Sequence, residues 1–162
     1  MISFSRNIQP YLLANIEKAY SDKSPFIQDL DIIYGQGCSA LWVKAQLLNI
    51  DLIANMKESA DMTALDKFAN LFIARYGTIK LTEFLLFCAR VTLGQYGRFY
   101  GYFDLIIIGD MFKKFKRERV DELESIERKR NMIEMEQRMN VVVERNHKMP
   151  DELRERLMGG KK

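Results

Sequence analysis

Residues 94–104 read GQYGRFYGYFD, and this stretch separates an apolar part of the chain from a charged one. It places three glycines and five aromatic residues among eleven positions. Glycine occurs where the backbone must turn or approach another group closely, and aromatic side chains carry the largest contact area per residue. We therefore predict that this stretch, called the corner below, turns the chain between two helices and is the best candidate for a functional surface.

Before the corner, apolar residues recur with the three- and four-residue spacing of helices. Four polar residues stand where N-caps are expected: Ser24, Ser39, Asp61 (or Thr63) and Thr82. Trp42 falls on an apolar face with Leu41, Leu48 and Leu52, so we predict that it is largely buried. The predicted helices cover residues 8–20, 25–33, 39–56, 61–76 and 83–93, and Gly94 is the expected stop of the last one.

After the corner, Asp104 stands at an N-cap position ahead of a helix predicted to run to about Asn146. The β-branched run Ile106–Ile108 could be argued as a strand, but it is short and the spacing after it is helical. At 1.5 Å per residue this helix would be roughly 65 Å long, so its distal part must be exposed or paired. Its apolar residues fit a heptad poorly, which argues against a long parallel coiled coil. Self-association through this part is still possible, and a last short helix is predicted over residues 151–158.

These patterns predict an all-α protein. Residues 1–119 form a compact bundle of about five helices whose last helix extends into a charged helical arm, and residues 120–162 hold that arm and the short terminal helix. Charge is uneven along the chain: residues 1–112 have 10 Lys/Arg and 11 Asp/Glu, a net of −1, whereas residues 113–162 have 15 and 11, a net of +4. The sign of the charge changes where apolar residues become sparse.

The residue types of common active sites are missing or scattered. His147 is the single histidine and lies in the polar tail, and Cys38 and Cys88 have no partner at metal-ligand spacing. No phosphate-binding glycine loop or dinucleotide fingerprint occurs. We therefore expect no enzyme, no catalytic residue, no cofactor and no metal. Without a signal peptide or an apolar run of roughly 20 residues, we expect a reduced, cytoplasmic protein that does not enter a membrane.

The corner admits three interpretations. It can be a structural turn in which Tyr96, Phe99, Tyr100 and Phe103 pack over the helix ends. It can be a protein-binding surface, since Tyr and Arg are favoured at interface centres. It can also contact nucleic acid, with Arg98 on phosphate and exposed aromatic rings on bases. The candidate contacts for a protein partner or for nucleic acid are Tyr96, Arg98, Tyr100 and Tyr102. We expect Arg98 to be exposed and Tyr100 to be a core residue, because alternate aromatics must face inward.

A basic cluster follows at the start of the long helix: Lys113, Lys114, Lys116, Arg117 and Arg119. It can be a solvated helix face balanced by the acidic residues that follow it. It lies within about 20 residues of Arg98, however, so cluster and corner could together form one basic, aromatic surface. The candidate contacts within the cluster are Lys113, Lys114, Lys116 and Arg117.

An ordered set of segments resembles a known group of proteins. The segments are residues 63–76, residues 79–84 (IKLTEF), residues 94–101 (GQYGRFYG), Asp104 and residues 117–119 (RER). They resemble small, mostly uncharacterised helical proteins of bacterial phages and mobile elements over about residues 60–120. The layout is similar to that of phage replication accessories such as helicase loaders, and the resemblance carries over no binding residue.

Together these patterns favour a non-enzymatic adaptor that acts by protein–protein contact. The resemblance implies a role in phage or mobile-element DNA metabolism, with a partner from the replication machinery. The alternative is a protein that binds DNA or RNA directly through the basic cluster and the corner. Binding measured across salt concentrations separates the two, because phosphate-driven binding weakens steeply as salt rises.

Overall fold

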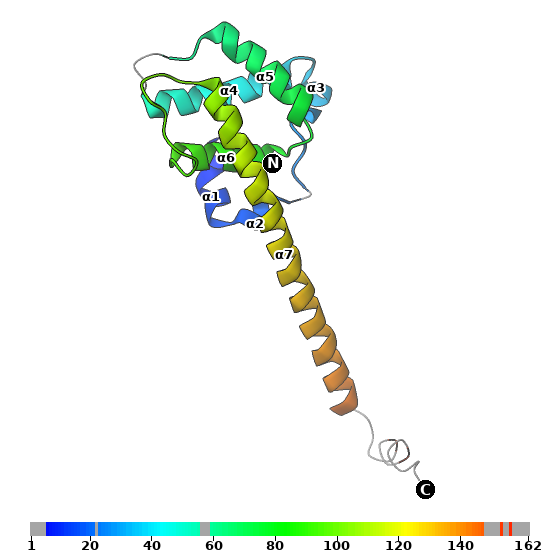
Figure 1. Ribbon diagram of the computed structural model, residues 1–162. Coiled ribbons are helices and arrows are strands. Elements are labelled where there is room, and N and C mark those ends of the chain that lie inside the picture. The colour runs from blue at the N-terminus through cyan, green and yellow to red at the C-terminus, as the bar shows by residue number, and fades with distance from the viewer. Residues whose placement is uncertain (1–5, 22, 56–58, 148–152, 154–155, 157–162) are drawn as a thin grey trace. The chain divides into compact units, whose positions relative to one another are not determined.

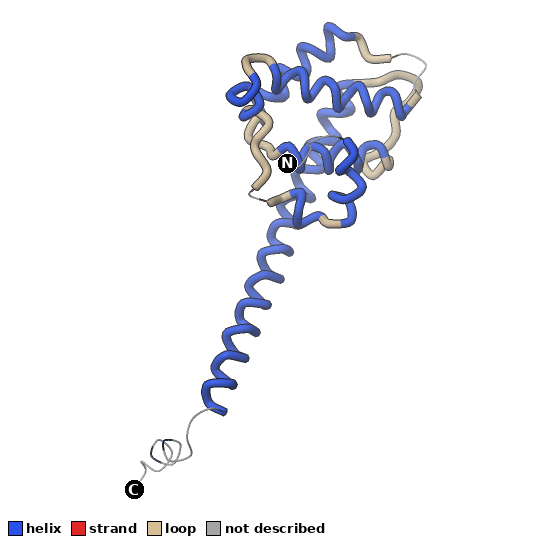
Figure 2. The backbone as a smooth tube through the Cα atoms, turned by 180° about the vertical axis from the view of Figure 1, so that it is seen from behind, coloured by secondary structure: helices blue, strands red, loops and turns tan. Residues whose placement is uncertain are grey.

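A computed structural model describes residues 6–21, 23–55, 59–147, 153 and 156, and it confirms the all-α fold within them (Figure 1). Figure 2 shows helices joined by loops and no strand in this described part, where the one β-bridge joins Phe26 and Lys80. The predicted helix over residues 151–158 lies outside the described residues except at two positions. The elements are η1 (Arg6–Ile8), α1 (Gln9–Ala14), α2 (Ile16–Ala19), α3 (Asp29–Tyr34), α4 (Cys38–Ala54), α5 (Met62–Tyr76), α6 (Leu81–Thr92) and α7 (Leu105–His147).

Helix α6 is the centre of the fold. Every residue from Leu81 to Val91 is buried, including two charged ones, Glu83 and Arg90. Helices α1, α2 and α4 contact α6, while α3 and α5 pack on α4. A helix that is buried all round needs neighbours on every side, and its charged residues need partners of opposite charge. Glu118 and Arg119 of α7 supply those partners.

The contacts within the chain divide it into two units, Met1–Val120 and Asp121–Lys162. In the first unit, Phe112 of α7 is the centre of an aromatic group. Its ring centroid lies 4.7 Å from that of Phe72 on α5 and 5.0 Å from that of Phe87 on α6, both edge to face. Phe115 lies 5.6 Å from Phe87. Such pairs add roughly 0.5–1.5 kcal/mol each beyond the burial of their area, and they hold the start of α7 in the core.

In the second unit the predicted long helix is confirmed as one uninterrupted element. Helix α7 continues to His147, and neither proline nor glycine occurs from Asp110 to that residue. Its large apolar side chains are more than half exposed at six positions: Met132, Ile133, Met135, Met139, Val141 and Val142. From Asp121 to Val142, the part of this unit whose side chains are described, the chain is a single helix with no buried residue.

The predicted single helix over residues 8–20 is wrong. The chain breaks at Asn15, where φ is −133° and ψ is 68°, so that α1 ends and α2 begins. The side-chain amide of Asn15 donates a hydrogen bond of 3.0 Å to the carbonyl oxygen of Tyr11. Asparagine offers the backbone such alternatives to the helical bonding pattern, which is why apolar spacing alone did not reveal the break.

Two of the predicted N-caps are confirmed. The Asp61 carboxylate accepts a hydrogen bond of 2.8 Å from the amide of Ala64 at the start of α5. The Asp104 carboxylate accepts one of 2.7 Å from the amide of Ile106 at the start of α7. Residues 106–108 therefore lie in the first turn of α7, and the prediction that they form a helix and not a strand is confirmed.

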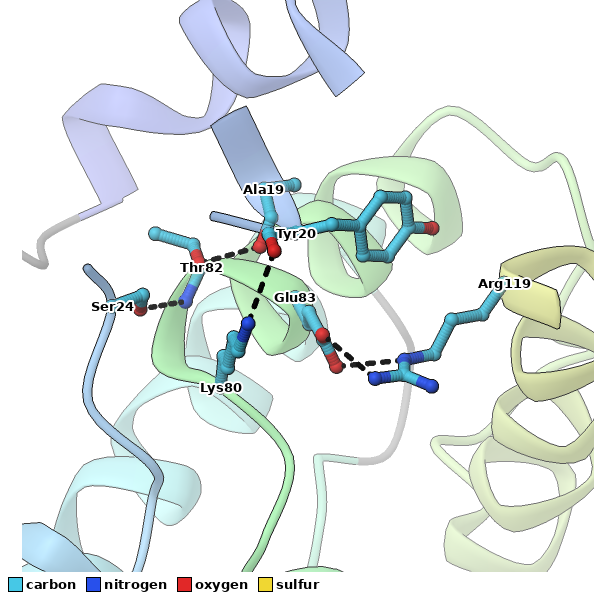
Figure 3. A network of polar contacts seen from close by, with 7 residues as sticks. All are labelled: Ala19, Tyr20, Ser24, Lys80, Thr82, Glu83 and Arg119. Carbon is cyan, nitrogen blue, oxygen red and sulfur yellow. Dashed lines mark hydrogen bonds and ion pairs between the residues drawn. The ribbon is translucent and has the colours of Figure 1, made fainter. Parts of the chain in front are cut away.

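Three other predicted caps are wrong, because their hydroxyl groups bond to distant segments instead. Thr82 donates a 2.6 Å hydrogen bond to the carbonyl of Ala19, and its amide donates one of 3.3 Å to the hydroxyl of Ser24 (Figure 3). Ser39 donates one of 2.9 Å to the carbonyl of Ile27. All three hydroxyl residues are buried, so they join parts of the fold that are far apart in sequence. The helix predicted after Ser24 begins only at Asp29.

Helix α4 is rotated relative to the predicted apolar face. Trp42 is partly buried and its ring centroid lies 5.6 Å from that of Phe84, so the prediction of a largely buried Trp42 holds in part. Leu41 and Leu52, assigned to the same inward face, are 66% and 74% exposed. The face that packs on the rest of the fold carries Val43, Leu47 and Ile50 instead.

Candidate functional site

The corner is a loop that is anchored at both ends. Tyr96 and Phe103 are buried, and the Tyr96 ring stacks on Phe87 of α6 at 6.1 Å between centroids. Its three glycines have φ angles of +75°, +123° and +87°, values that side chains with a Cβ rarely adopt. The glycines therefore let the chain turn sharply between α6 and α7 while two aromatic residues hold it on the core.

A polar network fixes Tyr96 to α7. The Tyr96 hydroxyl donates a 2.7 Å hydrogen bond to Glu118 Oε2, which also accepts from Gln95 Nε2 at 3.1 Å and pairs with the buried Arg90 at 3.3 Å. Lys114 Nζ donates a 3.2 Å bond to the carbonyl oxygen of Tyr96. Burial and the bond to Glu118 raise the pKa of Tyr96, against the opposing effect of Arg90. Tyr96 is thus a structural anchor and is not available to a partner.

Three corner residues face solvent instead. Arg98 is exposed, as predicted, and Tyr100 and Tyr102 are 81% and 54% exposed. The prediction that Tyr100 is a core residue is wrong. It assumed regular alternation along the loop, whereas the left-handed glycines at positions 97 and 101 change the direction of the chain on either side of Tyr100. The structure therefore presents Arg98, Tyr100 and Tyr102 together on one short, anchored loop.

The basic cluster does not act as one group. Arg119 turns inward to Glu83, whereas Lys113, Lys114, Lys116 and Arg117 are exposed on α7. Of these four, Lys113 pairs with Asp110 at 2.9 Å, and Lys116 lies 5.0 Å from the ring centroid of Tyr76. The pair with Asp110 raises the pKa of Lys113 and lowers that of the carboxyl group. Arg117 makes no polar contact in the described part of the chain.

A groove that the sequence did not indicate lies beside the corner. It consists of two adjoining cavities of about 290 Å³ and about 590 Å³ that share Ile53, Thr92 and Leu93. Three of its aliphatic side chains, Leu52, Ile53 and Leu93, are 74%, 54% and 70% exposed. We call it the corner groove. Its lining residues come from the N-terminal segment and α1 (Asn7, Gln9, Pro10 and Leu13), the end of α4 (Asn49, Ile50, Leu52, Ile53 and Ala54), the end of α6 (Ala89, Val91 and Thr92) and the chain that follows (Leu93, Gly94, Gly97, Arg98 and Phe99).

Apolar residues at the ends of two predicted helices were the available sequence signal for this groove. Leu52 and Ile53 precede the end of α4, and Leu93 follows the last residue of α6. Sequence alone does not show that these two helix ends meet the corner at one place. That juxtaposition depends on how α4 packs against α6.

The groups available for chemistry are few. Burial raises the pKa of the Cys88 thiol, which disfavours the thiolate form that acts as a nucleophile. Among the residues that the structure describes, no group of three His, Cys, Asp or Glu side chains could hold a metal ion. None of the described helices is both long and apolar enough to cross a membrane. The side chain of His147 lies outside the described part.

The chain belongs to a family of unknown function (DUF6633). The model of this family matches residues 61–145, which are just over half of the chain. The matched residues include α5, α6, the corner and most of α7. No curated protein and no solved structure matches the chain.

Proposed function

We propose that this member of the family is a non-enzymatic adaptor that binds a protein partner through the exposed residues of the corner. The observation that carries the proposal is the presentation of Arg98, Tyr100 and Tyr102 on a loop held by Tyr96 and Phe103. Tyrosine and arginine are enriched among the residues that dominate binding energy. A loop that is already ordered loses little entropy when a partner binds.

The exposed groups of the corner suit contact better than catalysis. Arg98 forms no ion pair or hydrogen bond with a described residue, and the corner group whose pKa is strongly raised, the Tyr96 hydroxyl, is already bonded to Glu118. A general acid or base must be able to exchange a proton directly with the reacting group. The proposal therefore includes no chemical step and no cofactor.

The pathway within this proposal is phage or mobile-element DNA metabolism, in the cytoplasm, with a partner from the replication machinery. Its support is the resemblance of residues 60–120 to small helical phage proteins, and a helicase-loader-like role fits the size and layout. The genes that neighbour this one provide the direct check: replication or packaging genes beside it would support the pathway, and an unrelated operon would count against it.

A direct nucleic-acid binder is the second candidate. Lys113, Lys114, Lys116 and Arg117 share the exposed face of α7, where they could contact phosphates. Three of the four already have a neighbour in Asp110, Tyr96 or Tyr76, which makes this surface less available than the corner. If this candidate holds, replacing Lys113 and Arg117 by Ala should make the plot of log binding constant against log salt concentration less steep. The change in slope should correspond to the loss of about two phosphate contacts.

The adaptor proposal is tested by comparing exposed tyrosines inside and outside the corner. Tyr100→Ala and Tyr102→Ala should each reduce recovery of a specific partner from native cells by about tenfold or more, the equivalent of roughly 1.4 kcal/mol. Tyr34→Ala is the matched control, because Tyr34 is 71% exposed on α3. If all three variants recovered every co-purifying protein as well as the wild type does, the corner would be only a structural turn.

A further inference from the structure

The walls of the corner groove leave large aliphatic side chains in contact with water. Leu52 and Ile53 at the end of α4 and Leu93 after α6 are each more than half exposed, although they lie beside one another in the groove lining. Covering apolar surface is favourable in proportion to its area, and exposed apolar surface with a polar rim is a usual feature of protein interaction sites. The groove is therefore suited to apolar side chains from another molecule.

Arg98 gives this groove an electrostatic preference. It is the one charged side chain among the described residues that line it, and it has no ion pair or hydrogen bond with any of them. The other polar lining side chains are neutral amides or hydroxyls: Asn7, Gln9, Asn49 and Thr92. An arginine fork pairs most strongly with a carboxylate, so the occupant should carry an acidic residue beside its apolar face.

The backbone of the groove indicates what secondary structure the occupant has. The amides of Leu93, Gly94 and Gly97 already donate to the carbonyls of Ala89, Val91 and Gly94, at 3.0, 2.9 and 3.1 Å. The described residues also include no strand whose edge could pair with an extended peptide. An extended occupant would leave its backbone groups unpaired against these walls, at a cost for each group. A helix satisfies its own backbone and offers only side chains.

We infer that the corner groove receives the apolar face of an amphipathic helix from a partner protein, and that a carboxylate beside this face pairs with Arg98. Apolar residues spaced i, i+3 or i+4, and i+7 on that helix cover Leu52, Ile53 and Leu93, which is the helix-in-groove mode of recognition. This inference rests on the adaptor function proposed above and assigns the surface and the kind of partner.

The test is a selection from a library of displayed helical peptides, randomised on one face and along its flank. Full-length wild-type protein is the target, and Leu93→Asp is the matched decoy. Because Leu93 is 70% exposed, this variant should retain the fold, which circular dichroism checks. Leu52→Asp provides a second decoy at an independent wall. We expect enriched peptides with apolar residues at helical spacing and a flanking Asp or Glu that bind each decoy at least about tenfold more weakly.

A charge reversal tests the role of Arg98. A selected peptide is compared with the same peptide in which its flanking Asp or Glu is replaced by Lys. The lysine peptide should bind wild type about tenfold more weakly than its parent, and Arg98→Glu should reverse this order of preference. Fluorescence anisotropy measures all four combinations. An unchanged order in Arg98→Glu would overturn the predicted carboxylate contact.

Other outcomes separate this inference from the adaptor proposal. Selected peptides that depend on Tyr102 but bind Leu93→Asp and wild type equally would leave the adaptor role standing and place the helix outside the groove. Enrichment of extended or proline-rich peptides, or no enrichment, would count against the helix. A wild-type dimer in light scattering that dissociates in Leu93→Asp would identify a second copy as the occupant and would also overturn the inference.

Discussion

Arg119 of α7 donates two hydrogen bonds to the carboxylate of Glu83 on α6, at 2.9 Å from Nε and 3.0 Å from Nη2 (Figure 3). The Glu83 side chain is 1% exposed and that of Arg119 is 28% exposed. A buried carboxylate is tolerated when it is paired and hydrogen-bonded. This pair therefore explains how a charged residue is buried in the first turn of the most buried helix, and it attaches α7 to that helix.

Removing the arginine should leave an uncompensated charge in the core. Arg119→Met is expected to lower the free energy of unfolding by about 3 kcal/mol, measured by urea denaturation with circular dichroism. Glu83→Gln combined with Arg119→Met should recover much of this loss, since the double variant buries no charge. A loss below about 1 kcal/mol in Arg119→Met would show that water reaches Glu83 and replaces its partner.

The buried tyrosine of the corner should make stability depend on alkaline pH. Burial and the bond to Glu118 raise the pKa of Tyr96 above its usual value of 10.0. A raised pKa in the folded state stabilises the protein below the unfolded-state pKa, and this contribution is lost as pH rises above it. The difference in unfolding free energy between wild type and Tyr96→Phe should therefore be constant below about pH 9 and shrink above pH 10. Tyr100→Phe, on the same loop but exposed, is the control variant.

The N-cap of α5 offers a matched pair of substitutions. Asp61→Ala removes the acceptor for the amide of Ala64 and should lower the free energy of unfolding by about 0.5–2 kcal/mol. Asp61→Asn keeps an acceptor oxygen of similar geometry and should cost much less. Thermal denaturation of the two variants would contradict the capping role if both lost the same stability.

The distal part of α7 should be dispensable for the fold of the first unit. The buried apolar residues in the described part of the chain all precede Asp121, so truncation there removes little burial. A chain ending at Glu127 keeps residues beyond Arg119 and should retain its helical spectrum and a cooperative thermal transition. It should also be monomeric in light scattering, since it lacks the exposed methionines of the arm. Failure to fold would show that residues beyond 127 contribute to the core.

Trp42 provides a fluorescence measure of the contact between α4 and α6. It is the single tryptophan, it is partly buried, and its ring lies against Phe84. Its emission maximum should lie at shorter wavelength than that of solvated indole and should move to longer wavelength in Phe84→Ala. An emission maximum typical of free indole in the wild type would contradict this packing.

Local signals explain which elements were predictable from the sequence. Asp61 and Asp104 cap helices through amides two or three residues away. The residue type at each of these positions was therefore enough to predict the cap. The uninterrupted run from Asp110 to His147 predicted one helix because helices need only short-range hydrogen bonds. Gly94 was expected to end a helix, and it adopts the left-handed conformation two residues beyond the last residue of α6.

The wrong caps and the wrong assignment of Leu52 share a long-range cause. Thr82 and Ser39 read as caps because both stand before apolar helical runs, yet their hydroxyls bond to carbonyls 63 and 12 residues away. Leu52 reads as a core residue from its spacing, yet the packing of α4 leaves it in the wall of the corner groove. No local pattern distinguishes a hydroxyl that caps its own helix from one that joins another segment.

The sequence by itself determined that this protein is helical, where the long charged helix starts, and that a turn rich in glycine and aromatics joins it to the apolar helix before it. These properties depend on side-chain spacing and on bonds within a few residues. Only the tertiary structure decided that Tyr96 is an anchor while Tyr100 and Tyr102 face solvent, and that two helix ends meet the corner in a groove. Burial is a property of the assembled helices, because a side chain becomes a core residue or a surface residue only when another segment covers it or leaves it exposed.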